Sequence, residues 1–111
     1  MAQSVYDYSF AKIYTLYLQK VTKKGRTQDE LDAVLSWLTG YDSATLHTSQ
    51  LALKDFFAAA KLNPQAPRIT GVVCGVRVEN IQEPLLQQIR YMDKVVDELA
   101  KGKALTKIER Q

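Results

Sequence analysis

The apolar spacing of residues 84–102 constrains the fold of this chain more than any other feature of its sequence. Pro84 suits the first helical position, where a missing N–H costs nothing, and Gly102 suits the left-handed residue that closes a last turn. At about 1.5 Å per residue the helix is roughly 27–29 Å long, so we expect it to form one wall of the core. Five apolar residues recur at alternating intervals of four and three, which places them on one helix face, and two more widen it: Leu85, Ile89, Met92, Val96 and Leu99, then Leu86 and Val95.

Length and composition indicate one soluble, globular domain over residues 1–111. The chain has 111 residues, of which 46 % are hydrophobic and 24 % charged, so it can bury a core without disulfides or metals. Its one cysteine, Cys74, cannot form an intrachain disulfide. We see neither a secretory signal nor an apolar run of about 20 residues. We therefore expect a cytoplasmic protein with no membrane segment and no cofactor.

The remaining periodicity predicts a mainly α fold, a small orthogonal bundle of four to six helices. Ser9 is a suitable N-cap for a helix over residues 10–22. Thr27 and Glu30 form a capping box at the start of a second helix, which Gly40 ends.

Shorter elements are predicted in the middle and at the end of the chain. Ser43 caps a helical turn through Leu46, and residues 51–62 form an Ala-rich helix. Its expected inward residues are Leu53, Phe56, Phe57 and Ala60. Prolines at 64 and 67 make residues 63–68 a loop, and a short helix follows Gly102.

Residues 69–78 fit two structures, and both bury the segment. Four valines favour a strand, which would give an α+β fold with one small two-stranded pairing; the only candidate partner strand lies near residues 5–10. Alternatively, Thr70 caps a short buried helix in which Gly71, Cys74 and Gly75 form a small-residue face. We favour the helix because the rest of the chain is helical.

The charges are unevenly distributed around a net charge of +3. A basic run lies at residues 20–26, and four acids follow it in a stretch without bases: Asp29, Glu30, Asp32 and Asp42. One interpretation is complementarity of helix ends, with bases closing one helix and acids opening the next. The other is a basic patch for nucleic acid or an acidic protein. The basic run itself, with no acid inside it, consists of Lys20, Lys23, Lys24 and Arg26.

Catalytic and metal chemistry have weak support. Cys74 needs a base to act as a nucleophile, and the only histidine, His47, has no evident structural tie to it. No second histidine accompanies His47 as a metal ligand, and the acids of residues 29–32 and 93–98 match no known ligand spacing. We expect those acids on solvated helix faces. We interpret four tyrosines as buried rings with exposed hydroxyls rather than stacking platforms for bases: Tyr6, Tyr8, Tyr14 and Tyr17.

Arg77 and Arg90 lie in apolar stretches, so each needs a carboxylate or carbonyl partner where it is buried. In the structural interpretation both form internal ion pairs. In the functional interpretation they bind an anion in a pocket near Tyr41 and Cys74. The candidate ion-pair partners are Glu79 or Glu83 for Arg77, and Asp93 or Asp97 for Arg90.

Several runs of the sequence together carry a resemblance: KGRT (24–27), WLTGY (37–41), LNP (62–64), ITGVVCGVRVE (69–79), IRY (89–91), DK (93–94) and DELAKGK (97–103). With these runs the chain resembles a family of small, uncharacterised bacterial proteins, domain of unknown function 2200. The resemblance implies a mainly helical, single-domain cytoplasmic protein, and it supplies no catalytic residue.

Three functional hypotheses remain. The first is a non-enzymatic helical interaction module that binds a macromolecular partner, either nucleic acid or an acidic protein, through residues 20–26. The alternative is a protein or small enzyme that binds an anionic metabolite in a pocket near Arg77 and Arg90. The third is self-association as a homo-oligomer.

Overall fold

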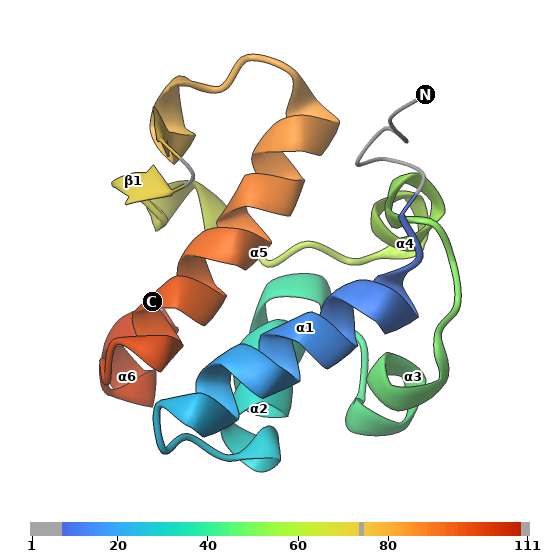
Figure 1. Cartoon of the computed structure of the whole chain (residues 1–111). Coiled ribbons are helices and arrows are strands. Elements are labelled where there is room, and N and C mark those ends of the chain that lie inside the picture. Colours follow the sequence, from blue (N-terminus) through green and yellow to red (C-terminus); the bar gives the residue numbers. More distant parts are fainter. Residues whose placement is uncertain (1–7, 74, 110–111) are drawn as a thin grey trace.

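The computed structural model describes residues 8–73 and 75–109 (Figure 1). In this part of the chain, short connections join six α-helices and one small antiparallel hairpin. The predicted mainly α character is confirmed, and the hairpin is the small two-stranded pairing of the α+β alternative. No helix within it combines the length and the apolar character needed to cross a membrane. The elements are α1 (Phe10–Lys23), α2 (Gln28–Thr39), α3 (Ser43–Thr48), α4 (Leu53–Ala59), the 3₁₀ turn η2 (Ala66–Arg68), β1 (Val72–Val73), β2 (Val76–Arg77), the 3₁₀ turn η3 (Val78–Asn80), α5 (Pro84–Ala100) and α6 (Leu105–Ile108).

Helix α5 contributes the long wall of the core that its apolar spacing predicts. Met92, Val96 and Leu99 are fully buried, and Ile89 is nearly so. Helices α1, α2, α4 and α6 all pack against α5, and Figure 1 shows α5 running from the top of the view toward the lower left. Pro84 begins the helix as predicted, while the Glu83 side chain caps it by accepting from the main-chain N–H groups of residues 85 and 86. The prediction for residues 84–102 is confirmed.

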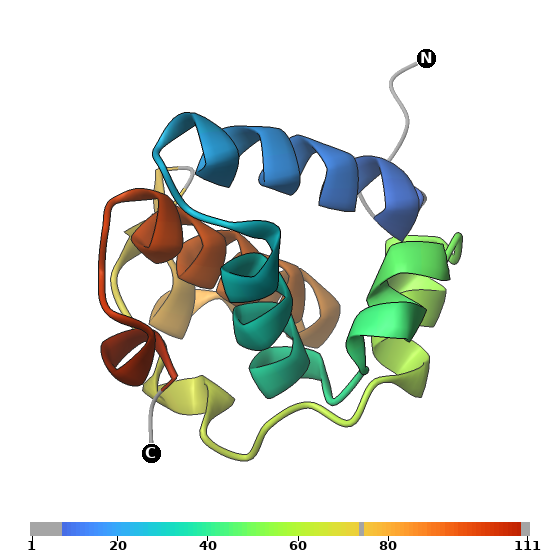
Figure 2. The ribbon, with the colours of Figure 1, turned by 90° about the horizontal axis from the view of Figure 1, so that it is seen from below.

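Helices α1 and α2 complete the main packing, and Figure 2 shows α1 along one side of the molecule. Ser9 caps α1 by accepting from the N–H of residue 12 at 3.2 Å. Thr27 and Glu30 form the predicted capping box at the start of α2. Gly40 ends α2 with φ of 77°, and a Cβ there would lie 2.9 Å from the carbonyl oxygen of Lys61. Only glycine fits this close approach without strain.

The N-cap of α3 and the C-terminal end of α4 differ from those that the sequence predicts. Asp42, not Ser43, caps α3, because the Asp42 carboxylate accepts from the N–H of Thr45 at 2.8 Å and Ser43 is the first helical residue. Helix α4 covers only Leu53–Ala59, since Ala60 adopts an extended backbone that lets the chain turn back along α2. The predicted inward residues Leu53, Phe56 and Phe57 are buried, and the ring of Phe56 stacks on Phe10 at 4.0 Å between centroids.

The helix favoured for residues 69–78 is wrong, and the strand alternative is correct. β1 pairs with β2 in an antiparallel hairpin, so the segment supplies its own partner and needs none near residues 5–10. Gly71 and Gly75 have φ of 112° and 80°, which a helix excludes and a tight turn accepts. The loop predicted for residues 63–68 contains the short turn η2.

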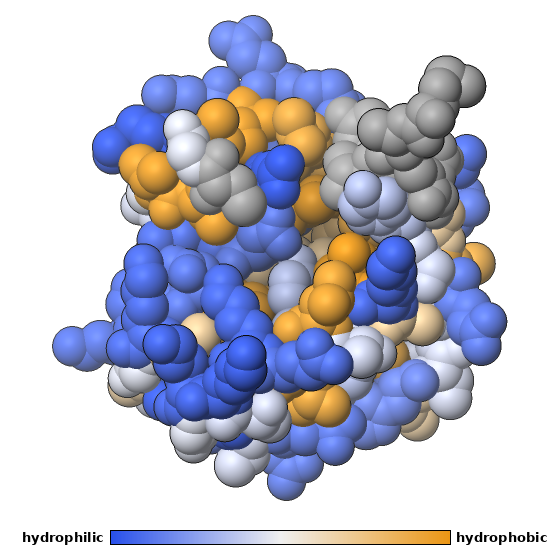
Figure 3. Space-filling view, in the orientation of Figure 1, coloured by the Kyte–Doolittle hydropathy of each residue, from blue (hydrophilic) through white to orange (hydrophobic). Residues whose placement is uncertain are grey.

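The hairpin is only partly buried, so the predicted burial of the whole segment is also wrong. Ile69, Val73 and Val78 face the core, whereas Val72 and Val76 are about half exposed. Apolar residues gather around this part of the surface and the start of α5 in Figure 3. Alternation explains why Val72 is exposed beside the buried Val73, because successive side chains point to opposite faces, whereas both residues of β2 are exposed.

Candidate functional site

The fold brings two basic segments that are far apart in sequence onto one surface. Lys20 Nζ lies 3.4 Å from Asp97 Oδ1, and Lys101 Nζ lies 3.0 Å from Asp97 Oδ2. Arg26 Nη2 donates to the main-chain oxygen of Lys103 at 3.2 Å. The end of α1 therefore lies beside the end of α5. We call this cluster the basic surface; it consists of Lys20, Lys23, Lys24, Arg26, Lys101 and Lys103.

Two of the acids that contact the basic surface, Asp97 and Glu98, lie beneath its lysines, whereas Glu30 is more exposed than the Arg26 side chain that it binds. The Asp97 side chain is 18 % exposed and that of Glu98 is 8 % exposed, against 73 % for Lys101. Burial raises the pKa of Asp97, but its ion pairs with Lys101 and Lys20 outweigh burial and hold that pKa below its ordinary value. In Figure 3, hydrophilic residues cover this part of the molecule, at lower left. The ammonium groups thus form the outer layer.

The four predicted basic residues differ in how they are paired. Arg26 Nη2 lies 2.8 Å from Glu30 Oε2, and Lys20 shares Asp97 with Lys101. Lys23 and Lys24 are exposed, and neither has an ion-pair partner in the part of the chain that the structure describes. Lys20 and Lys23 also lie in the last turn of α1, and Asp29 and Glu30 in the first turn of α2. Complementarity of helix ends and a basic surface therefore coexist.

The residues predicted for an anion pocket have separate internal partners. Arg77 Nε lies 3.5 Å from Glu79, Arg90 Nη1 donates to Asp93 at 2.8 Å, and the Tyr41 hydroxyl donates to the main-chain oxygen of Phe56 at 2.6 Å. No pocket opens among residues 8–73 and 75–109. Cys74, the fourth residue predicted near that pocket and the candidate nucleophile, lies outside the described residues.

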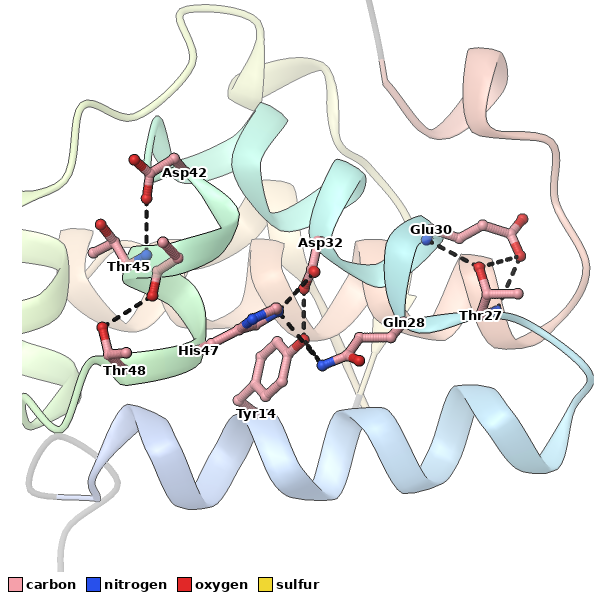
Figure 4. A network of polar contacts seen from close by, with 10 residues as sticks. Tyr14, Thr27, Gln28, Glu30, Asp32, Asp42, Thr45, His47 and Thr48 are labelled. Atoms are coloured by element: carbon pink, nitrogen blue, oxygen red, sulfur yellow. Dashed lines mark hydrogen bonds and ion pairs between the residues drawn. The ribbon is translucent and has the colours of Figure 1, made fainter.

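A buried polar network, which the sequence interpretation missed, joins α1, α2 and α3 (Figure 4). Asp32 accepts a hydrogen bond from the Tyr14 hydroxyl at 2.5 Å, and its second oxygen lies 2.8 Å from His47 Nε2. Gln28 Nε2 donates to the Tyr14 hydroxyl oxygen at 3.0 Å. Since an ionised carboxylate only accepts, His47 donates from Nε2. The network links three helices through one carboxylate.

Two sequence expectations are corrected by the polar contacts of Asp32, Tyr14 and Tyr17. Asp32 does not lie on a solvated helix face; it is only 4 % exposed. The hydroxyls of the buried Tyr14 and Tyr17 are bonded to Asp32 and Asp93 rather than left to water. The burial of Asp32 could have been predicted from its spacing, because it lies three residues before the apolar Leu35 and therefore on the same side of α2.

The network predicts how stability changes in alkali. Burial raises the pKa of Tyr14 to about 12, with the hydrogen bond to Asp32 and the Asp32 charge adding to the effect. The contribution of neutral Tyr14 to the free energy of unfolding is complete below pH 10 and is lost as the pH rises to about 12. We expect the free energy of unfolding of the protein to fall in that range by about 2 kcal/mol more than that of Tyr14→Phe. Denaturant titrations across the range measure this, and parallel losses in both proteins would contradict it.

Comparison with known proteins identifies one family and one similar solved structure. A family model described as "Uncharacterized protein conserved in bacteria (DUF2200)" matches residues 4–110. A solved structure titled "Crystal structure of uncharacterized protein SP1917" is 41 % identical, with a TM-score of 0.87 over 97 % of this chain and 92 % of that one. No curated protein matches the sequence.

Proposed function

The chain belongs to the DUF2200 family of bacterial proteins, and we propose its function from its surface: it is a non-enzymatic interaction module that binds an acidic macromolecule through the basic surface. One observation supports this most: residues 20–26 and residues 101–103 lie together. A run of four cations thereby becomes a surface of six.

The charge balance around the basic surface favours an anionic partner. Only one of the four acids expected to cancel the basic run, Glu30, forms an ion pair with it. Asp32 is turned inward to Tyr14 and His47, and Asp42 caps α3. Asp97 and Glu98 are covered by the cations they bind. The field above the ammonium groups is therefore positive, and it attracts polyanions over about one Debye length.

A macromolecule fits this surface better than a small ligand does. Small-ligand sites are concave and bury most of the ligand, whereas no pocket opens in the described part of the chain. An arrangement of exposed lysine side chains binds weakly at each point and gains affinity from many charges on one partner. The expected cytoplasmic location would give it access to such polyanions.

The proposal predicts a position-specific loss of binding to heparin, used as a generic polyanion. We expect Lys23→Gln/Lys24→Gln to elute from immobilised heparin at clearly lower salt than the unaltered protein, because two exposed cations without ion pairs are removed. The matched control is Lys12→Gln/Lys61→Gln, which lowers the net charge equally at two exposed lysines outside the basic surface. Equal elution of the two double variants would contradict the proposal.

A further inference from the structure

Building on the proposed function, we infer that the basic surface binds double-stranded nucleic acid by its phosphate backbone, without reading the base sequence. Phosphate contacts need only lysine, arginine and main-chain donors. The cations of the basic surface supply this chemistry from two adjoining helix ends.

An acidic protein partner would need apolar contacts with the basic surface in addition to charge complementarity. Protein interfaces are anchored by clusters of aromatic or apolar side chains that are fully covered on binding. The large apolar side chains exposed in the described residues are Leu16, Leu51, Val72 and Val76, and none belongs to residues 20–26 or 101–103. Leu16, one helical turn before Lys20, is the nearest along the chain. A single exposed leucine is ordinary on a protein surface and forms no anchor cluster.

Single strands are bound mainly by stacking of bases on aromatic rings. Residues 20–26 and 101–103 contain no aromatic residue. The tyrosines closest along α1, Tyr14 and Tyr17, have buried rings, and their hydroxyls are bonded to Asp32 and Asp93. Without stacking, binding follows charge density, and a duplex releases more counterions per contact than a single strand. The basic surface therefore favours the duplex.

The number of cations sets the expected salt dependence. Lys23 and Lys24 lack ion pairs among the described residues, and the Lys101 side chain is 73 % exposed. With Lys20, Arg26 and Lys103 partly engaged by acids, about four to six phosphate contacts are available. The logarithm of the affinity should fall with the logarithm of the salt concentration with a slope of about −3.6 to −5.4.

The test measures fluorescence anisotropy of labelled probes with the full-length chain, from about 20 to 200 mM salt. The probes are a mixed-sequence DNA duplex, a second duplex of unrelated sequence, oligo-thymidine of equal length and polyglutamate. We expect both duplexes to bind equally, with the stated slope, and more tightly than the other two probes. Lys23→Gln/Lys24→Gln should lower the slope by about 2, whereas Leu16→Gln should bind the duplex like the unaltered protein.

The contrary outcomes separate this inference from the proposed function. Tighter binding of oligo-thymidine, a preference between the duplexes, or loss of duplex binding in Leu16→Gln would overturn the inference. Binding of polyglutamate but not of a duplex, lost in Lys23→Gln/Lys24→Gln, would overturn it while supporting an acidic protein partner for the same surface. Absence of binding to every probe at the lowest salt would overturn both.

Discussion

Replacing Asp32 by alanine is expected to destabilise the protein by about 3 kcal/mol, the largest single effect among the polar residues discussed. The carboxylate accepts from the Tyr14 hydroxyl and from His47 Nε2, and it is 4 % exposed. Alanine leaves the Tyr14 hydroxyl buried without its acceptor, and it releases α3 from α2. We expect a melting temperature lower by about 10–20 °C, measured by circular dichroism.

Two variants show whether this loss comes from the network. Asp29→Ala removes an exposed carboxylate from the first turn of the same helix and should cost less than about 1 kcal/mol. Tyr14→Phe/Asp32→Ala should be more stable than the sum of its single changes predicts, because no orphaned hydroxyl remains. A cost for Asp32→Ala no greater than that for Asp29→Ala would contradict a structural role for the network.

The parts of the fold that depend on nearby residues were predictable from the sequence. The capping box at Thr27 and Glu30, the start of α5 at Pro84 and the turn at Gly40 each follow from a few adjacent positions. The apolar face of α5 was predictable because its spacing repeats over four turns. These features need no knowledge of what lies across the core.

The hairpin was harder to predict because its evidence is short and ambiguous. Two-residue strands give almost no alternation, and valines with small residues between them also fit a buried helix. What decides the structure is the positive φ of Gly71 and Gly75, which the sequence permits but does not require. The error in favouring a helix came from extending the helical character of the rest of the chain to this segment.

Only one part of the basic surface was predictable from the sequence, the part whose residues are close together along the chain. Lys20, Lys23, Lys24 and Arg26 stand together in the sequence, but their neighbours from the end of α5 are more than 70 positions away. The pairing of Asp32 with Tyr14 and His47 likewise joins three elements. Such contacts depend on how the helices pack against one another, and local patterns in a single sequence do not show which distant residues will meet.

Removing lysines from both segments is expected to have the largest effect on binding. At about 50 mM salt, each phosphate contact contributes roughly tenfold to the affinity. Lys23→Gln/Lys24→Gln/Lys101→Gln should therefore weaken binding to the DNA duplex on the order of 1000-fold and lower the salt slope by about 3. Glutamine keeps the helix propensity near that of lysine, so the melting temperature of the variant should confirm that it is folded.

The single change Lys101→Gln tests most directly whether the ends of α1 and α5 act as one surface. Lys101 lies outside the basic run and shares Asp97 with Lys20. We predict that Lys101→Gln weakens duplex binding roughly tenfold at about 50 mM salt, as much as Lys23→Gln does, while the control Lys12→Gln leaves it unchanged. Duplex binding by Lys101→Gln that equals binding by Lys12→Gln would show that the two segments do not bind as one surface.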